Sequence, residues 1–78
     1  MAVSAYVLIQ TEVGKAAAVA EAVGQIDGVR TAEDVTGPYD VIVRVEADTL
    51  DDVAKRVVSR IQVVDGITRT LTCPIVHL

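Results

Sequence analysis

The residues that could do chemistry are few and lie in two short segments. The first, TGPYD at residues 36–40, combines a turn-forming Gly-Pro pair with one tyrosine and one carboxylate. The second, ITRTLTC at residues 67–73, carries threonine hydroxyls at alternate positions, followed by a cysteine. A carboxylate can bind a cation or cap its own turn, and hydroxyls can donate hydrogen bonds to an anion. Neither segment contains a self-evident catalytic motif, so its role depends on the elements that position it.

Metal and redox chemistry have little support in the sequence. Cys73 is the single cysteine and His77 the single histidine, so an intrachain disulfide is impossible and a metal site is not expected. No cofactor is implied. We expect Cys73 to be a small buried apolar residue and His77 to be exposed and uninvolved. Tyr6 is expected in the core or at a subunit interface.

Length and composition point to a small domain with a partner. We expect the 78 residues to form one domain over residues 1–78. Below about 70–80 residues a core rarely suffices alone, and 51% of the residues are apolar. The net charge of −4, with scattered basic residues, argues against direct binding to nucleic acid. Without a long apolar run or a signal peptide, we expect a cytoplasmic protein and no membrane contact.

The apolar pattern predicts six elements. Residues 3–10 and 41–47 are typical of buried strands, residues 29–35 of a polar strand, and residues 67–76 of an alternating strand. Residues 14–26 predict a helix ended by Asp27-Gly28; a second helix starts at a capping Thr49 and ends at Asp65-Gly66. The predicted buried stripes are Val19, Ala22, Val23 and Ile26 in the first helix, and Leu50, Val53, Ala54, Val57 and Ile61 in the second.

The order β-α-β-β-α-β predicts an α+β fold, a ferredoxin-like sandwich with an antiparallel sheet in the order 4-1-3-2. This order places the two most apolar strands, the first and third, at the centre. The polar second strand lies at one edge. The fourth strand contains Pro74 and lies at the other, where a missing backbone N–H is tolerated.

The central strands are apolar on both faces, although two helices can cover only one. In the third strand valines alternate with Ile42, and in the first strand Leu8 alternates with buried positions. Leaving such side chains in water forgoes about 1.5–3 kcal/mol each relative to full burial. We therefore expect a homodimer packed face to face through the sheet, with Arg44 at its rim. The alternative is that these side chains are simply tolerated at the surface.

Within this frame, two short motifs resemble a known family. VRTAEDVTGPYDVIVRVEA, followed by a helix and DGITRTLT, resembles the effector-binding domain of the Lrp/AsnC transcriptional regulators, also called the RAM domain. One hallmark is a Gly-x-x-Asp turn after the second strand, here Gly37 and Asp40. The other is a Gly-(Val/Ile)-x-x-Thr-x-Thr start to the fourth strand, here Gly66, Ile67, Thr70 and Thr72. The resemblance covers essentially the whole chain.

This resemblance implies a homodimer that assembles into an octamer or decamer, with amino acids or related metabolites held between dimers. Full-length members carry an N-terminal helix-turn-helix domain. This chain begins at the first strand of the effector domain, so we expect a stand-alone form without direct DNA binding. It would modulate transcription through full-length Lrp/AsnC regulators as partners.

The resemblance also assigns roles to five residues. Asp40 would bind the ammonium group of an amino acid. Backbone amides beside Gly37 and Tyr39, with the Thr70 and Thr72 hydroxyls, would bind its carboxylate, and Tyr39 would form a pocket wall. Each role has a simpler alternative, because Asp40 can merely cap its turn and threonines are common on edge strands.

Two other functions fit the same architecture. Small dimeric monooxygenases and isomerases share it, but they need a cavity lined by His, Asn, Trp or Phe, and this chain has no Phe or Trp. A ligand-free assembly factor is the second alternative. An apo structure with side chains blocking the hairpin end would favour it.

Overall fold

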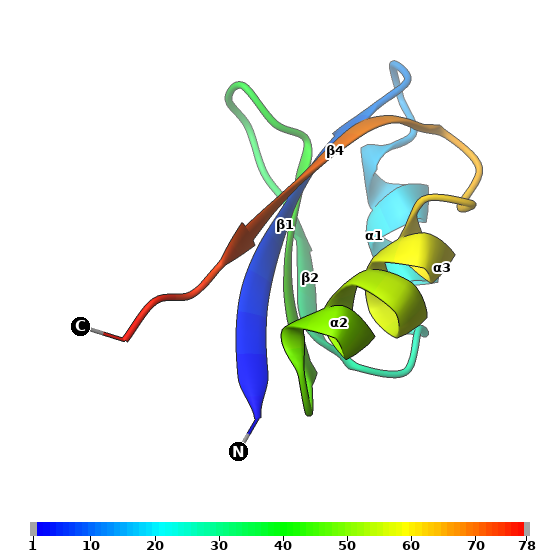
Figure 1. The fold of residues 1–78 in the computed structure, drawn as a ribbon. Helices are drawn as coiled ribbons and strands as arrows, with labels where there is room; N and C mark the ends of the chain where they lie inside the picture. Colours follow the sequence, from blue (N-terminus) through cyan, green and yellow to red (C-terminus); the bar gives the residue numbers. More distant parts are fainter. Residues whose placement is uncertain (1, 78) are drawn as a thin grey trace.

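The computed structural model describes residues 2–77 and contains a four-stranded sheet covered on one side by helices (Figure 1). The strands are β1 (Val3–Thr11), β2 (Val29–Asp34), β3 (Val41–Ala47) and β4 (Ile67–Pro74). The helices are α1 (Ala16–Gly24) and a continuous helical stretch made of α2 (Leu50–Asp52), η1 (Val53–Val58) and α3 (Ser59–Ile61). The sheet order is β2-β3-β1-β4 and all neighbouring strands are antiparallel. The predicted ferredoxin-like fold is confirmed.

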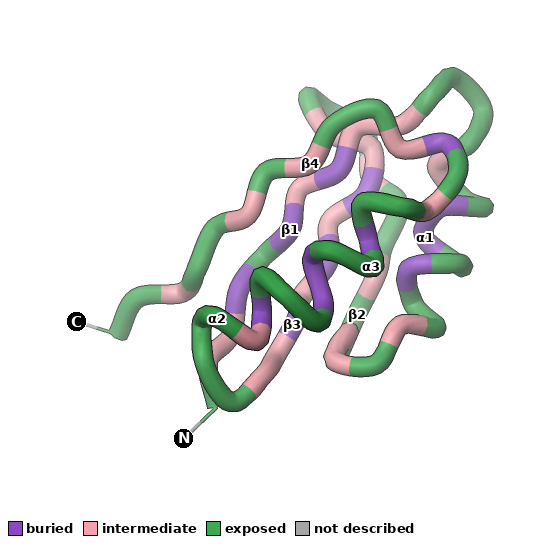
Figure 2. Tube along the Cα trace, turned by 45° about the vertical axis from the view of Figure 1, so that its right-hand side comes forward, coloured by how far each residue is buried: buried purple, intermediate pink, exposed green. Residues whose placement is uncertain are grey.

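The core lies between the sheet and the helices, and most of its residues are valines. Figure 2 shows buried positions alternating along β1 and β3 and recurring on the inner side of both helices. From the sheet the core takes Ala5, Val7, Ile9, Val41, Val43 and Val45, all with no exposed surface. The helices add Val19, Ala20, Val23, Val53, Val57, Val58 and Ile61. None of the helices within residues 2–77 is long and apolar enough to cross a bilayer.

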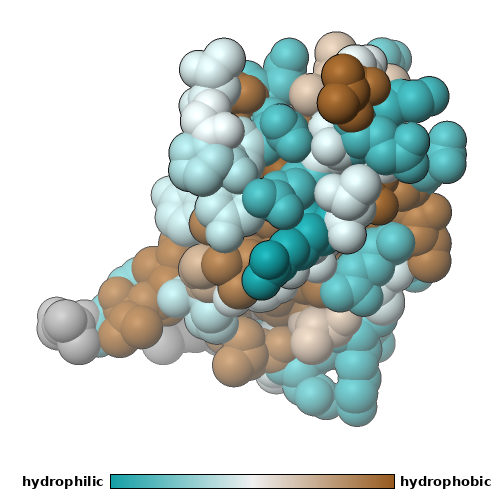
Figure 3. Space-filling model, turned by 90° about the horizontal axis from the view of Figure 1, so that it is seen from above, coloured by the Kyte–Doolittle hydropathy of each residue, from teal (hydrophilic) through white to brown (hydrophobic). Residues whose placement is uncertain are grey.

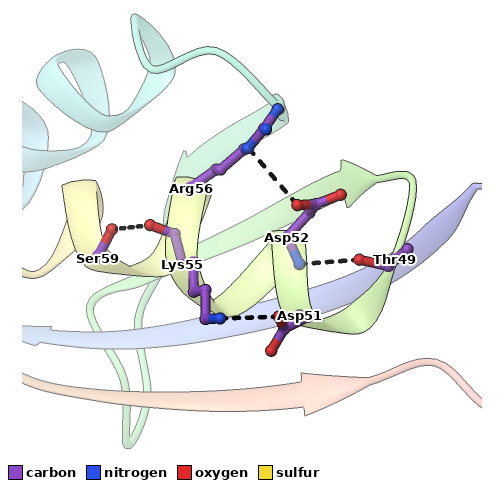
Figure 4. A network of polar contacts seen from close by, with 6 residues as sticks. All are labelled: Thr49, Asp51, Asp52, Lys55, Arg56 and Ser59. Atoms are coloured by element: carbon purple, nitrogen blue, oxygen red, sulfur yellow. Dashed lines mark hydrogen bonds and ion pairs between the residues drawn. The ribbon is translucent and has the colours of Figure 1, made fainter.

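The second helical stretch begins as the sequence predicts. Thr49 has an extended backbone, and its hydroxyl accepts a hydrogen bond from the Asp52 N–H at 3.1 Å, which satisfies one of the free amides of the first turn. The predicted pair of Asp51 and Lys55 is confirmed, with 3.0 Å between the carboxylate and the ammonium group (Figure 4). Both side chains are exposed, so this pair stabilises the helix by only about 0.3–0.5 kcal/mol.

The middle of this helical stretch departs from the predicted pattern. The segment η1 is a π-helix, whose wider turn accommodates one more residue than an α-helical turn. Within η1, Val57 and Val58 are both buried, and the prediction that Ala54 would be buried is wrong. The prediction that Leu50 would be buried is also wrong, because this residue before η1 is 51% exposed. In α1 the buried stripe is likewise shifted, since Ala20 is buried and Ala22 is exposed.

A bulge changes which side chains of β4 face the core. Thr11 pairs with Ile67 and Gln10 with Arg69, so Thr68 is an extra residue without a partner in the register. A single extra residue reverses the alternation that follows it. Beyond the bulge the threonines of β4 face the core side, while Leu71 and Cys73 face the open side of the sheet. The prediction that Cys73 would be buried is therefore wrong, because it is exposed.

Gly28 ends the α1–β2 turn in a position that excludes a side chain. Its φ is 94°, and an added Cβ would lie 2.7 Å from Val57 Cγ2 and 3.2 Å from the Glu46 carbonyl oxygen. We expect Gly28→Ala to destabilise the fold by about 1–3 kcal/mol through overpacking. Gly14→Ala is the matched control, because its φ of 79° is similar but nothing lies within 4 Å of an added Cβ. Urea unfolding should show the larger loss for Gly28→Ala; equal losses would contradict the steric explanation.

Candidate functional site

The β2–β3 hairpin that carries TGPYD folds back onto the end of β1. Figure 1 shows the hairpin at one end of the sheet, away from the helices. The Gln10 side-chain amide donates to the Pro38 carbonyl oxygen at 3.1 Å, and the Asp40 N–H donates to the Ile9 carbonyl oxygen at 2.9 Å. Gly37 has a φ of 133°, a conformation that favours glycine. Two hydrogen bonds to β1 therefore hold the hairpin, and Gly37 provides the backbone conformation of its turn.

Asp40 has a structural contact that the sequence did not reveal. Its carboxylate Oδ2 accepts a hydrogen bond from the Thr11 backbone N–H at 2.8 Å, in a partly buried position. Thr11 is the residue at which the register with β4 shifts, so the carboxylate pairs with a backbone group at the bulged end of β1. Within residues 2–77 the other oxygen, Oδ1, makes no hydrogen bond. Asp40 therefore anchors its hairpin and still presents one carboxylate oxygen.

The two threonines of the predicted site lie on the helix side of the sheet. Thr70 pairs with Ile9 and Thr72 with Val7, both of which point into the core. The Thr70 hydroxyl accepts a hydrogen bond from the Gln62 side-chain amide at 3.3 Å. A shallow cavity of about 210 Å³ lies beside it, lined by Gln62, Ile67, Thr68, Arg69 and Thr70.

Within one chain the five predicted residues form two groups at the same end of the sheet. Ile9 pairs with Val41 on one side and with Thr70 on the other, so the hairpin and the start of β4 flank the end of β1. Gly37, Tyr39 and Asp40 belong to the hairpin group, and the two threonines to the β4 group. Seen from this end, the surface is mostly hydrophilic or neutral, and apolar side chains continue along the protruding C-terminal segment (Figure 3).

The open face of the sheet carries a cluster of apolar side chains around one arginine. Tyr6 is 40% exposed and Leu71 45% exposed, while Leu8 and Ile42 are half-buried. Arg44 pairs with Tyr6 across β1 and β3. Its guanidinium donates to the Tyr6 hydroxyl at 3.1 Å and lies 5.6 Å from the ring centroid, within the range of a cation–π contact. Tyr6 is therefore not a core residue of the single chain.

Comparison with known proteins identifies the domain. The family model of the Lrp/AsnC ligand binding domain matches residues 4–77. The chain belongs to this family. A search of curated proteins gives no match.

Several solved structures share the fold of this chain. TTHA0845 from Thermus thermophilus is 28% identical with a TM-score of 0.88, covering 97% of this chain and 95% of its own. The hypothetical protein PHS023 from Pyrococcus horikoshii is 34% identical with a TM-score of 0.85, covering 97% and 92%. AsnC from E. coli has the same fold at 21% identity and a TM-score of 0.86, covering 97% of this chain but 52% of AsnC.

This Lrp/AsnC domain also has a charged cavity that sequence reasoning missed. It lies at the far end of the sheet from the hairpin and has a volume of about 430 Å³. Its walls include the guanidinium-bearing residues Arg30, Arg56 and Arg60. Arg56 and Arg60 are four residues apart on one helical stretch, which was a usable signal. Arg30 lies on β2, and its position near Arg56 and Arg60 could not be predicted without the register of β2 with β3.

Proposed function

We propose that this domain is a ligand-sensing, oligomerising module that binds an amino acid or related small metabolite. It would act on transcription through full-length Lrp/AsnC regulators and would not itself catalyse a reaction. The observation that carries this proposal is the family match over residues 4–77. A transcriptional regulator from Neisseria meningitidis, crystallised as an L-Met complex, has the same fold at 14% identity and a TM-score of 0.78, covering 96% of this chain and 50% of its own.

The hairpin supplies the ammonium-binding part of the proposed ligand site. Asp40 Oδ2 is occupied by the Thr11 N–H at 2.8 Å, and the open Oδ1 would accept a hydrogen bond from the ligand ammonium. Gly37 and Tyr39 stand beside it, and their backbone amides would bind the ligand carboxylate. Holding Asp40 by one oxygen fixes the direction of the other before the ligand arrives, which reduces the ordering cost of binding.

A second chain would complete this site. In one chain β1 separates the hairpin from β4, and Thr70 and Thr72 lie on the opposite side of the sheet from Ile42. The hydroxyls therefore reach a ligand at the hairpin only if they come from a neighbouring subunit. Ligand binding between subunits would couple occupancy to assembly, because each bound ligand adds contacts that a separate dimer lacks.

The dimer proposed here forms by packing the open faces of two sheets. A two-fold axis brings the same patch of each copy together, and the patch is the apolar cluster of Tyr6, Leu8, Ile42 and Leu71. Arg44 spans this cluster with its charge directed over the Tyr6 ring. Further assembly of such dimers to an octamer or decamer would place hairpin ends against neighbouring subunits. With a net charge of −4, we assign DNA contact to the partner regulators.

A thermal-shift screen against the twenty common amino acids tests the proposal, with native mass spectrometry on each hit. A ligand at about one hundred times its Kd stabilises the protein by about 2.7 kcal/mol, which raises the Tm of a domain this small by roughly 10 °C or more. For each hit, the matched control is its analogue without the α-amino group, which removes the partner of Asp40. If no amino acid changes the Tm or the assembly mass, the sensing function is wrong.

A further inference from the structure

The charged cavity at the end of the sheet opposite the hairpin is not used by the proposed function. Its volume of about 430 Å³ is within the range of about 300–1,000 Å³ for small-ligand sites. Its walls come from the N-terminal start of the chain, the α1–β2 turn, β2, the end of β3 and the second helical stretch. Three of the chain's seven basic residues gather here although the net charge is −4. The charged lining is Asp27, Arg30, Glu46, Asp48, Asp52, Arg56 and Arg60.

Two departures from regular backbone geometry border this cavity. Along β2 and β3 the register passes from the pair Val29 and Val45 to the pair Thr31 and Arg44, so Arg30 is an extra, bulged residue. On the opposite wall, the π segment η1 contains Arg56. Bulges redirect side chains and are common beside active sites, and π segments are frequent at functional sites. Both irregularities therefore lie at an arginine that lines this cavity.

The arginines are only loosely engaged by their neighbours. Arg30 Nη2 lies 3.6 Å from Glu46 Oε1, and Arg56 Nε lies 3.5 Å from Asp52 Oδ1. Both distances exceed the about 2.7–2.9 Å of a charge-assisted hydrogen bond. Arg60 makes no ion pair with any residue between 2 and 77. Since each guanidinium carries five N–H donors, most donors in this cavity are free to bind a ligand.

The basic side chains of the second helical stretch lie on two different sides of it. Figure 4 shows Arg56 directed to the opposite side of the helix from Lys55, which pairs with Asp51 in solvent. Arg56 and Arg60 are one helical turn apart and line the same cavity. Each planar guanidinium group can bind two oxygens of a carboxylate or phosphate at once.

We propose that this cavity binds a small ligand through a single carboxylate or phosphate group, held by Arg56 and Arg60 with Arg30 on the facing wall. The acids Asp27 and Asp48 in the lining disfavour a ligand with several negative charges. They also offer acceptors to hydroxyl or amino groups elsewhere on the ligand. Because the arginines are exposed, binding is expected to be weak, in the millimolar range, and to weaken with salt. This site is separate from the hairpin and does not depend on the proposed amino-acid site.

Nuclear magnetic resonance titration of the 78-residue chain tests this proposal. Inorganic phosphate and acetate are added separately at constant ionic strength, and the backbone amide and arginine side-chain N–H signals are followed. We expect saturable shifts around Gly28, Arg56 and Arg60. Tighter binding of phosphate would identify a phosphate ester as the ligand class, and tighter binding of acetate would identify a carboxylate.

Matched variants separate specific binding from general attraction to positive charge. Arg60→Gln should weaken the affinity about tenfold or more, as expected for the loss of one charge-assisted hydrogen bond. Lys55→Gln removes the same charge from the other side of the helix and should leave the affinity unchanged. Asp40→Asn should also leave it unchanged, even where it removes amino-acid binding. Absence of saturation with both anions, or equal losses in Arg60→Gln and Lys55→Gln, would overturn the proposal.

Discussion

Ile42→Asp should convert the proposed dimer into a folded monomer at micromolar concentration. Ile42 lies in the middle of the open face, paired with Leu8 in β1 and with Glu33 in β2, and it is half-buried within one chain. In a two-fold interface the substitution introduces one unpaired charge from each copy. Leaving a buried charge unpaired costs about 2–5 kcal/mol, so two of them should weaken dimerisation by about a thousandfold or more. Light scattering coupled to size-exclusion chromatography measures the change in mass.

Two further variants make this test specific. Val63→Asp introduces the same charge at an apolar residue that is 82% exposed in the turn before β4, away from the open face, and should stay dimeric. Ile42→Lys is needed because aspartate would stand opposite Glu33, where like charges destabilise the sheet; lysine removes that repulsion. Circular dichroism should show folded protein for all three. If both Ile42 variants remain dimers, the open face is not the interface.

The strand order could be predicted from the sequence because more deeply buried strands contain more apolar residues. A central strand tends to be more apolar than an edge strand, as residues 41–47 are, and the polar residues 29–35 fit an edge. The start of the second helix was equally accessible, since Thr49 and Asp52 form a local contact three residues apart. The strand order and the helix start are therefore predictable from this sequence, because one depends on the overall burial of each strand and the other on residues close in sequence.

Two of the features that sequence reasoning missed each depend on one inserted residue. The π segment moves Val58 into the core and Ala54 out of it, yet its residues are compatible with an ordinary α-helix. The bulge at Thr68 places Ile67 and Thr70 on the core side together, although strict alternation from residue 67 puts them on opposite sides. Whether a chain accepts such an inserted residue depends on packing against elements distant in sequence. The hydrophobic periodicity of the sequence therefore does not reveal the insertion.

The candidate site shows the same limit. The strand order predicted from the sequence implies that the hairpin and the start of β4 lie at one end of the sheet, and the register agrees, because Ile9 pairs with both strands. The hydrogen bond between Asp40 and the Thr11 N–H joins residues 29 positions apart, so no local pattern could reveal it. Asp40 therefore anchors the hairpin in addition to its proposed role in binding the ligand ammonium. A test of ligand binding must separate these two roles.

Asp40→Asn should remove most amino-acid binding while leaving the fold nearly intact. The asparagine side-chain oxygen can still accept the Thr11 N–H hydrogen bond, now held by Oδ2 at 2.8 Å, but the negative charge facing the ligand ammonium is lost. A hydrogen bond to a charged group contributes about 1.5–3 kcal/mol, so the affinity should fall by about 10- to 150-fold. Isothermal calorimetry with the amino acid found in the thermal-shift screen measures this loss.

Asp40→Ala separates anchoring from ligand binding, because it removes both contacts at once. The Thr11 N–H then loses its partner in a partly buried position, which should destabilise the fold by about 1–3 kcal/mol in urea unfolding, whereas Asp40→Asn should lose much less. Asp34→Asn is the charge-matched control, because Asp34 is an exposed acid at the end of β2. The dimer should persist in all three variants, since Asp40 is bonded to the end of β1 and not to the apolar cluster. If Asp40→Asn binds the amino acid as tightly as the unmodified chain, Asp40 serves only to fix the hairpin, and the ammonium must be bound elsewhere.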